Sequence, residues 1–278
     1  MAMQGDETTL QAMSPSPDAQ QQAQISANKE LWELGLDWVR QYANRDLRAV
    51  EVMLLIRYRD VLRGRVLELG CGAGRVTSYL AAISDHVQGL DVSPKMLEYC
   101  RQAYPNAEFR EGDLRDLSAY EDGSIDVIMG PGNILDVLTD DERQDVLDQL
   151  RRVISPEGLL IFSSHNRDNA PQIKKPLDMV HWRNPGFLIR DLQYLPRRLR
   201  NRRRRLRHER VEAHYSILND TSHEFLALHY YISRDDQERQ LRDHAFELIE
   251  CLDLDSWVVA PGTASPNCPE LHYVARPI

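Results

Sequence analysis

Short apolar runs alternate with amphipathic stretches through the middle of the chain, and this pattern dominates the sequence. The runs have the length and composition of buried strands, and they lie at residues 66–69, 87–92, 107–114, 125–130 and 158–166. The stretches between them are helical in character, and the clearest, at 139–154, has an apolar stripe at positions 146, 147, 150 and 153. Alternating strands and helices predict an α/β fold.

The pattern differs on the N-terminal side of this region. Residues 1–24 contain few large apolar side chains, which predicts a disordered or loosely attached tail. Two amphipathic helices are expected over residues 25–42 and 47–62, ahead of the first strand.

The alternation stops after residue 166 and resumes near the C-terminal end. Residues 211–218 and 224–233 predict a hairpin. A helix at 234–245 and strands at 246–254 and 270–276 follow it.

Three alternate glycines, Gly70, Gly72 and Gly74, follow the first apolar run, and Glu68 precedes them within it. Glycine is required where the backbone turns sharply or lies against a ligand, because a Cβ atom would collide. A dinucleotide-binding turn has the spacing G-x-G-x-x-G, but Arg75 stands here at the position of its third glycine. The turn therefore predicts a ligand of another kind, or a glycine turn without a ligand.

Polar residues mark the end of the second strand. Asp91 lies about twenty residues after the first glycine, at the spacing where a carboxylate reaches the hydroxyls of a ribose. Ser93 and Pro94 then start a helix as cap and first-turn residue, which turns Met96 back toward the strand end. Met96 either covers a base or packs in the helix core, and the sequence leaves both open.

These residues, in this order, resemble class I S-adenosylmethionine-dependent methyltransferases over about residues 54–166. The resemblance implies a seven-stranded Rossmann-like sheet whose last strand is antiparallel, helices on both faces, and S-adenosylmethionine as cofactor. It assigns cofactor contacts to the turn and the strand ends: Glu68, Gly70, Gly72, Gly74, Asp91, Val92, Met96, Asp113, Leu114 and Gly130. Many relatives have Gly-Phe before the sixth strand, where this chain has Ala245 and Phe246.

The resemblance also divides the chain into parts. Residues 25–166 would form the cofactor-binding core with its N-terminal helices, and residues 234–278 would add the C-terminal helix and last two strands. Residues 167–233 would be a cap insertion after strand five, over the mouth of the cofactor cleft. We expect residues 197–210 to form an exposed helix on this cap, because nine arginines cannot be buried without matching acids.

The composition fits one large domain, or one domain with an insertion. The chain has 278 residues, of which 42% are hydrophobic and 28% charged. Its four cysteines form no C-x-x-C pair, as is typical of a reducing cytosol, so we expect a cytoplasmic protein. No apolar run approaches the length of a membrane span and the N-terminus lacks a secretion-signal pattern, so we expect no membrane partner.

Charge is unevenly distributed along the chain. Residues 167–233 contain 14 Lys and Arg against 7 Asp and Glu, whereas the whole chain has a net charge of −9. Residues 197–210 hold nine arginines in fourteen positions, a density that favours phosphate binding. The segment supports an alternative function, RNA- or ribosome-directed methylation. Its other interpretation is a solvated helix facing acidic neighbours, including those of a second copy in a homodimer.

The residues after the fourth strand argue against methylation of base amino groups. Enzymes of that kind usually have Asp/Asn-Pro-Pro-aromatic there, whereas this chain has Gly130, Pro131, Gly132 and Asn133. We therefore expect methyl transfer to a nitrogen or oxygen of a small molecule, by in-line displacement that depends mainly on positioning. A non-catalytic cofactor-binding protein is a third alternative, since binding motifs show only binding.

Candidates for catalysis lie at the ends of strands four and five. His165 could accept a proton from the acceptor, or bond a backbone carbonyl. Asn133 could orient the acceptor or the cofactor, or cap a helix. A general base is needed only for an acceptor that arrives protonated.

Candidates for substrate binding are aromatic and histidine side chains, namely Tyr42, Tyr215, His229 and Tyr231. Within the hairpin, alternation lets Tyr215 and one of Tyr230 and Tyr231 face the substrate while the other packs. No pair of histidines in the insertion has convincing metal-ligand spacing on one helical face, so we expect no metal.

Overall fold

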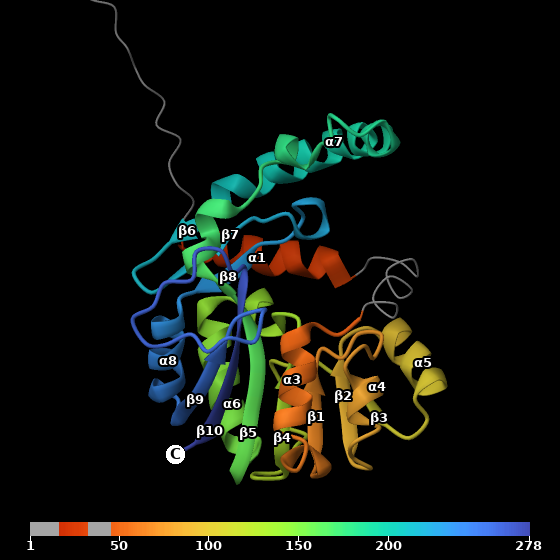
Figure 1. The fold of residues 1–278 in the computed structure, drawn as a ribbon, viewed down its shortest axis with the longest axis vertical. Helices are drawn as coiled ribbons and strands as arrows, with labels where there is room; N and C mark the ends of the chain where they lie inside the picture. The colour runs from red at the N-terminus through yellow and green to blue at the C-terminus, as the bar shows by residue number, and fades with distance from the viewer. Residues whose placement is uncertain (1–16, 33–45) are drawn as a thin grey trace, which may run out of the picture.

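The computed structural model describes residues 17–32 and 46–278, and a twisted sheet forms its centre (Figure 1). Five strands run parallel in the order β3-β2-β1-β4-β5. β10 lies antiparallel to β5, and β9 lies antiparallel to β10. The strands are β1 Val66–Leu69, β2 Val87–Asp91, β3 Glu108–Glu111, β4 Ile125–Gly130, β5 Ile154–Asn166, β9 Phe246–Leu252 and β10 Glu270–Pro277. They confirm the α/β sheet with an antiparallel last strand.

Helices cover both faces of this sheet because successive strand residues point to opposite sides. In β4, Val127 and Met129 belong to the core under α3 and α4, whereas Ile128 belongs to the core under α6 and α8. The helices are α1 Pro17–Trp32, α3 Ala49–Arg57, α4 Thr77–Leu80, α5 Pro94–Ala103, α6 Asp140–Val153, α7 Pro185–Arg205 and α8 Arg234–Asp243. Within the described parts of the chain, no helix combines the length and apolar content that a membrane span requires.

The α6 helix confirms the prediction at 139–154, and its start shows why. Thr139 accepts a hydrogen bond from the backbone of Glu142, and the Glu142 carboxylate accepts one from the backbone of Thr139. This capping box satisfies donors that a helix start otherwise leaves free. Apolar residues at helical spacing then face the sheet, so local sequence alone defines the element.

The strand β5 extends past the parallel sheet and carries a second group of strands. Gly130, the last residue of β4, lies opposite Phe162, and the next part of β5 continues alone on that side. His165 and Asn166 then pair with Tyr231 and Ile232 of β8. The added strands are β6 Arg210–Val211, β7 Tyr215–Leu218 and β8 His229–Ile232.

The predicted hairpin is therefore confirmed, but its strands are shorter and its connection is longer than expected. β7 and β8 are antiparallel, and residues 219–228 join them. Asn219 holds this connection together, because its side-chain amide donates to the carbonyls of Phe225 and Ala227. The connection is thus a wide loop organised by the Asn219 side chain.

The helix α1 begins inside the segment for which the sequence predicted a loose tail. Its Gln24 side chain is buried and donates to the carbonyl of Leu138 at 2.7 Å. Asn28 donates to the carbonyls of Val137 and Leu228 and accepts from the backbone of Leu228. The boundary at residue 24 is corrected for this reason: amide side chains rather than large apolar residues attach the segment.

We expect Asn28→Ala to lower the free energy of unfolding by about 2–3 kcal/mol, because it leaves buried backbone groups without partners. Gln22→Ala, on the exposed face of the same helix, should change it by less than about 0.5 kcal/mol. Urea denaturation of the two variants and the wild type measures both values. Equal values for the two variants would contradict the anchoring role of Asn28.

Candidate functional site

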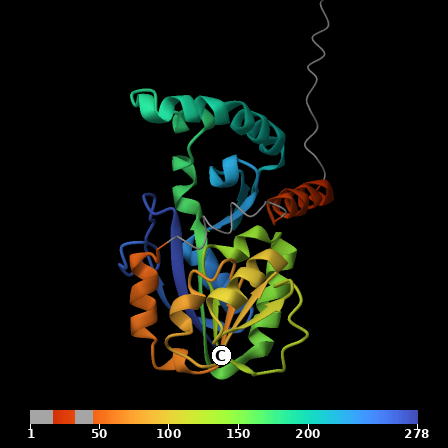
Figure 2. The same cartoon turned by 90° about the vertical axis from the view of Figure 1, so that its right-hand side faces the viewer.

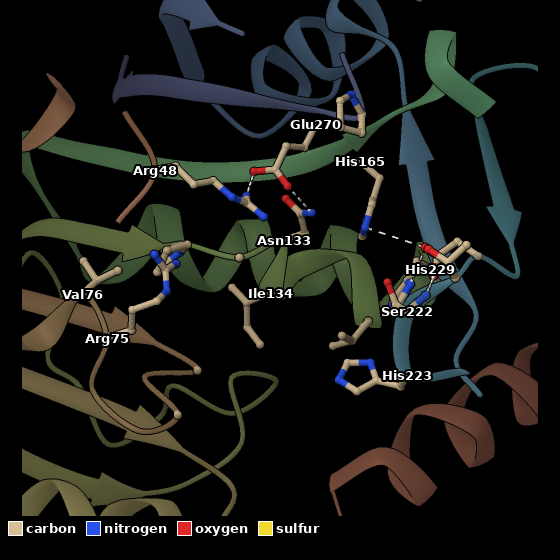
Figure 3. A pocket seen from close by; sticks show the side chains of 18 of the residues that line it. Arg48, Arg75, Val76, Asn133, Ile134, His165, Ser222, His223, His229 and Glu270 are labelled. Atoms are coloured by element: carbon tan, nitrogen blue, oxygen red, sulfur yellow. Dashed lines mark hydrogen bonds and ion pairs between the residues drawn. The ribbon is translucent and has the colours of Figure 1, made fainter. Parts of the chain in front are cut away.

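A cavity of about 630 Å³ lies at the carboxyl ends of the parallel strands. Its lining runs from the glycine turn after β1 to the 219–228 loop, β8 and the start of β10 (Figure 3). In open α/β sheets ligands bind at this edge, where loops from several strands meet. The cavity therefore has one end on the glycine turn and another end on the residues that β5 and β8 supply.

The three glycines of the turn have different reasons to be glycine. All have positive φ, at 59° for Gly70, 53° for Gly72 and 77° for Gly74. A Cβ atom would come within 2.5 Å of Ile134 at Gly70 and within 2.4 Å of Tyr104 at Gly74, so these two allow close packing. A Cβ at Gly72 would meet no atom within 4 Å. Gly72 therefore faces open space in the cavity, where a ligand can lie against the backbone.

Two carboxylates hold this turn in place. Asp91 accepts hydrogen bonds from the backbone of Gly72 and of Ser93, each at 2.8 Å, and burial raises its pKa. Glu68 accepts a hydrogen bond from the Thr77 hydroxyl, and burial raises the pKa of Glu68 to about 8. The turn is thus fixed before any ligand arrives.

The structure places half of the predicted cofactor residues on the cavity wall. These are Glu68, Gly70, Gly72, Asp91 and Met96. The remainder do not line it: Gly74, Val92, Asp113, Leu114 and Gly130. Among them, Asp113 forms an ion pair with Arg115, and Leu114 packs in the core. The roles of all ten residues stay predictions.

His165 lies at the other end of the cavity, and a buried aspartate orients it. Asp136, in the short helix η2 (Ile134–Val137), accepts hydrogen bonds from the His165 backbone at 2.6 Å and from Nδ1 of its ring at 2.7 Å. Burial alone would raise the pKa of Asp136, but the hydrogen bond from His165 and the charge of Arg143 lower it overall. An ionised carboxylate only accepts, so Nδ1 of the His165 ring carries a proton.

Arg143 neutralises Asp136 from inside the protein. Its side chain has no exposed surface, and it donates to Asp136 at 2.7 Å. It also donates to Gln237 and Gln240 of α8, and its guanidinium lies 4.6 Å from the centre of the Tyr230 ring. A buried arginine is tolerated only when its donors are satisfied, and these contacts satisfy them.

A second ion pair stands beside His165. Nδ1 of His229 lies 2.8 Å from Oδ2 of Asp220, and the Tyr231 hydroxyl donates to the same oxygen at 2.8 Å. Burial is the largest single influence on the pKa of Asp220 and raises it, but the charge and hydrogen bond of His229 together with the other neighbours lower that pKa overall. Burial lowers the pKa of His229, but the charge and hydrogen bond of Asp220 together with the charge of Asp136 raise that pKa overall.

The rings of this second group pack directly on His165. The ring centre of His165 lies 5.0 Å from that of His229 and 4.8 Å from that of Tyr231, with both pairs stacked. Nε2 of His165 is 3.8 Å from Asp220. The ring of His165 therefore lies in the cavity wall, with Nε2 directed toward a buried ion pair.

Three side chains of the types that ligate metals lie close together here. Spacing along a helix could not predict this cluster. Ligand atoms of His165, Asp220 and His229 lie within 4.8 Å of one another. They come from the end of β5, the 219–228 loop and β8, so no sequence spacing joins them. Asp220 already accepts hydrogen bonds from His229 and Tyr231, and the arrangement shown is that of an ion pair.

Asn133 lies between the two ends of the cavity. Its amide nitrogen donates to Glu270, which also pairs with Arg48 (Figure 3). It stands at the cap position of η2 with a φ of 60°, but its side chain makes no cap hydrogen bond. Its carbonyl oxygen is buried, and no donor among the described residues reaches it.

The four predicted substrate residues have different positions. His229 and Tyr231 line the cavity, whereas Tyr42 lies outside the described residues. Tyr215 is on the opposite side of the hairpin and stacks on Tyr230 at 4.8 Å. The expectation that Tyr215 faces the cavity is corrected, because the register pairs Tyr215 with Ile232 and so gives it the same face as Tyr230.

Comparison with known proteins agrees with this architecture. Residues 66–158 match the family model of a methyltransferase domain. The chain is 29% identical over 140 residues to a malonyl-[acyl-carrier protein] O-methyltransferase of Bacillus cereus, covering 48% of this chain and 50% of that protein. It is 30% identical over 118 residues to a demethylmenaquinone methyltransferase of Clavibacter sepedonicus, covering 41% and 45%. The chain spans about half the length of the curated relatives it matches.

Solved structures share the fold at low sequence identity. A 1,6-didemethyltoxoflavin-N1-methyltransferase of Burkholderia thailandensis, solved with 1,6-didemethyltoxoflavin and S-adenosylhomocysteine, has a TM-score of 0.57 and 12% identity. The match covers 95% of this chain and 91% of that one. The PH0226 protein of Pyrococcus horikoshii has a TM-score of 0.53 and 20% identity, with 82% and 88% covered.

We expect the pair of His229 and Asp220 to give the stability of the protein a defined pH dependence. The pKa of His229 is higher in the folded protein than its ordinary value of 6.5. Its contribution to the free energy of unfolding is therefore complete below pH 6.5 and is lost as the pH rises through the higher, folded-state pKa. The stability of the wild type relative to His229→Gln should therefore shrink with rising pH, by up to about 1.4 kcal/mol per pH unit in that window. Urea denaturation of both proteins across pH measures the difference. A difference that grows with pH would contradict the assignment.

Proposed function

We propose that this chain, whose residues 66–158 match a methyltransferase domain, transfers a methyl group from S-adenosylmethionine to a small molecule. The acceptor atom is a nitrogen or an oxygen. One observation carries the proposal: a single cavity joins the open backbone at Gly72 to the ring of His165. The first can hold a cofactor, and the second can receive a proton.

The glycine end of the cavity fits the cofactor. Gly72 leaves space for it against the backbone, and Asp91 presents carboxylate oxygens at the end of β2, where ribose hydroxyls are bound in this fold. Met96 lies on the wall beside them as an apolar surface for a base. The cofactor supplies a methyl group already activated by its positive sulfur. Glu68 acts indirectly, since it holds Thr77 and with it the start of α4.

The other end of the cavity fits an acceptor that arrives with a proton. Asp136 fixes the ring of His165 so that Nε2 is the nitrogen that accepts. A hydroxyl or ammonium proton of the acceptor passes to Nε2, and His165 later releases it to solvent. Asp220, His229 and Tyr231 orient the acceptor beside the ring.

Two relatives support a small acceptor without fixing its atom. One is named for O-methylation of a malonyl group on a carrier protein, the other for N-methylation of a small heterocycle. The RNA-directed alternative has less support, because no residue of the arginine-rich segment 197–210 lines the cavity. We propose that the reaction uses no metal, since Asp136 already orients the base and the cofactor is already activated.

We expect Gly72→Val to abolish binding of S-adenosylmethionine and Asp91→Ala to weaken it at least tenfold. The first fills the space open to the ligand, and the second removes the hydrogen-bond acceptor. Gly262→Val is the matched control, since Gly262 also has a positive φ and an open Cβ position but lies outside the cavity. Isothermal titration calorimetry of the three variants measures affinity. Wild-type affinity in Gly72→Val would contradict the proposed position of the cofactor.

We expect His165→Gln to lower kcat by roughly 10²–10⁴-fold with little change in cofactor affinity, because a general base contributes about that much. His181→Gln is the control, since His181 forms a similar pair with Asp191 at 2.6 Å but lies outside the cavity. The assay follows S-adenosylhomocysteine formation with a panel of amines, phenols and carboxylates, with and without a chelator. An unchanged kcat in His165→Gln would exclude the base role while leaving methyl transfer intact.

A further inference from the structure

The helix α7 lies at the end of the molecule farthest from the C-terminus and is packed from one side (Figures 1 and 2). Its inner face rests on the 219–228 loop. Arg198 pairs with Glu224, Asn201 donates to the carbonyl of Glu224, and Arg205 donates to the carbonyl of Leu226. The loop thus supplies partners for the inner arginines: Glu224 for Arg198 and the Leu226 carbonyl for Arg205.

The outer face of α7 carries large aliphatic side chains in solvent. Ile189 is 69% exposed, Leu192 is 42% exposed and Leu199 is 46% exposed, and Leu206 follows at 49%. Their spacing of three and seven residues places them in one stripe along the helix. A helix that only covers a protein surface turns such residues inward, so this apolar stripe is unusual.

Exposed arginines accompany the apolar stripe. Arg197, Arg200 and Arg203 are exposed, and no ion pair joins any of them to a carboxylate within the described part of the chain. The sequence from residue 192 to residue 208 contains no acid at all. Leu199, Arg200 and Arg203 share the wall of a shallow hollow on this face. The outer face therefore combines exposed apolar side chains with three arginines that no carboxylate of the described residues neutralises.

We propose that the outer face of α7 docks on the surface of a lipid bilayer that contains anionic lipids. The apolar stripe enters the boundary between headgroups and acyl chains, and the arginines contact lipid phosphates. The sequence predicted no membrane partner because no segment is apolar enough to span a bilayer. A helix that lies on the surface needs amphipathicity and basic charge rather than a long apolar run.

The apolar stripe decides between a bilayer and a nucleic acid. Arginines alone would suit either polyanion. Four exposed aliphatic residues add nothing to phosphate contacts or to base stacking, whereas burial in an interface gives each of them a favourable contribution. The inference concerns a surface outside the proposed active site and does not depend on the proposed methyl transfer.

Flotation of the full chain with vesicles tests the proposal. We expect binding to vesicles of phosphatidylcholine with phosphatidylglycerol, weaker binding at high salt, and none to phosphatidylcholine alone. Arg197→Gln/Arg200→Gln/Arg203→Gln should weaken binding by about 100-fold, because each arginine near an anionic surface contributes roughly fivefold. Ile189→Ser/Leu192→Ser/Leu199→Ser should also lose binding.

The matched control is Arg59→Gln/Arg63→Gln/Arg101→Gln, which makes the same change in net charge at exposed positions on the body. It should bind vesicles like the wild type. Thermal melting and calorimetric cofactor binding confirm that each variant is folded. Failure to bind anionic vesicles, or equal binding with and without phosphatidylglycerol, overturns the proposal. A second result also overturns the proposal: the serine triple variant binds vesicles like the wild type, and the arginine triple variant loses binding to single-stranded RNA. That result would identify a nucleic-acid surface.

Discussion

A buried carboxylate, whose negative charge requires a positive partner and hydrogen-bond donors, organises the centre of this molecule. Asp136 has no exposed surface, and an unpaired charge in such a place is strongly destabilising. Arg143 supplies the opposite charge from α6, and Ser164 and His165 supply donors from β5. Arg143 is satisfied in turn by glutamines of α8. One ionic group thus fixes how η2, α6, β5 and α8 pack together, and the orientation of the His165 ring follows from it.

The length of β5 explains how the glycine turn after β1 and the residues around His165 line one cavity. The strand β4 ends opposite Phe162, but β5 continues to Asn166 and gives β8 an edge on which to pair in parallel. The hairpin thereby becomes part of the main sheet, which is a more rigid arrangement than a cap resting on loops. Side chains on one face of β8, His229 and Tyr231, are held directly against His165.

Local signals in the sequence predicted the local parts of this structure. The glycine turn, Asp91, the capped helix α6 and the parallel strands all depend on residues close together in the chain. The polar cluster at the acceptor end could not be predicted, because Asp136, His165 and Asp220 meet only through tertiary packing. The face of Tyr215 depended on the hairpin register, which residue alternation alone does not define. The start of α1 at Pro17 was not predicted, because amide side chains rather than apolar ones attach it.

The 219–228 loop belongs to two parts of the molecule at once. Its carbonyls at Glu224 and Leu226 hold the inner face of α7, while its Asp220 carries the charge that His229 and Tyr231 share. The helix and the cavity therefore contact the same short segment of backbone. Linkage is reciprocal in free energy: if contact at α7 favours one arrangement of the loop, an occupied cavity that favours the same arrangement strengthens that contact by the same factor.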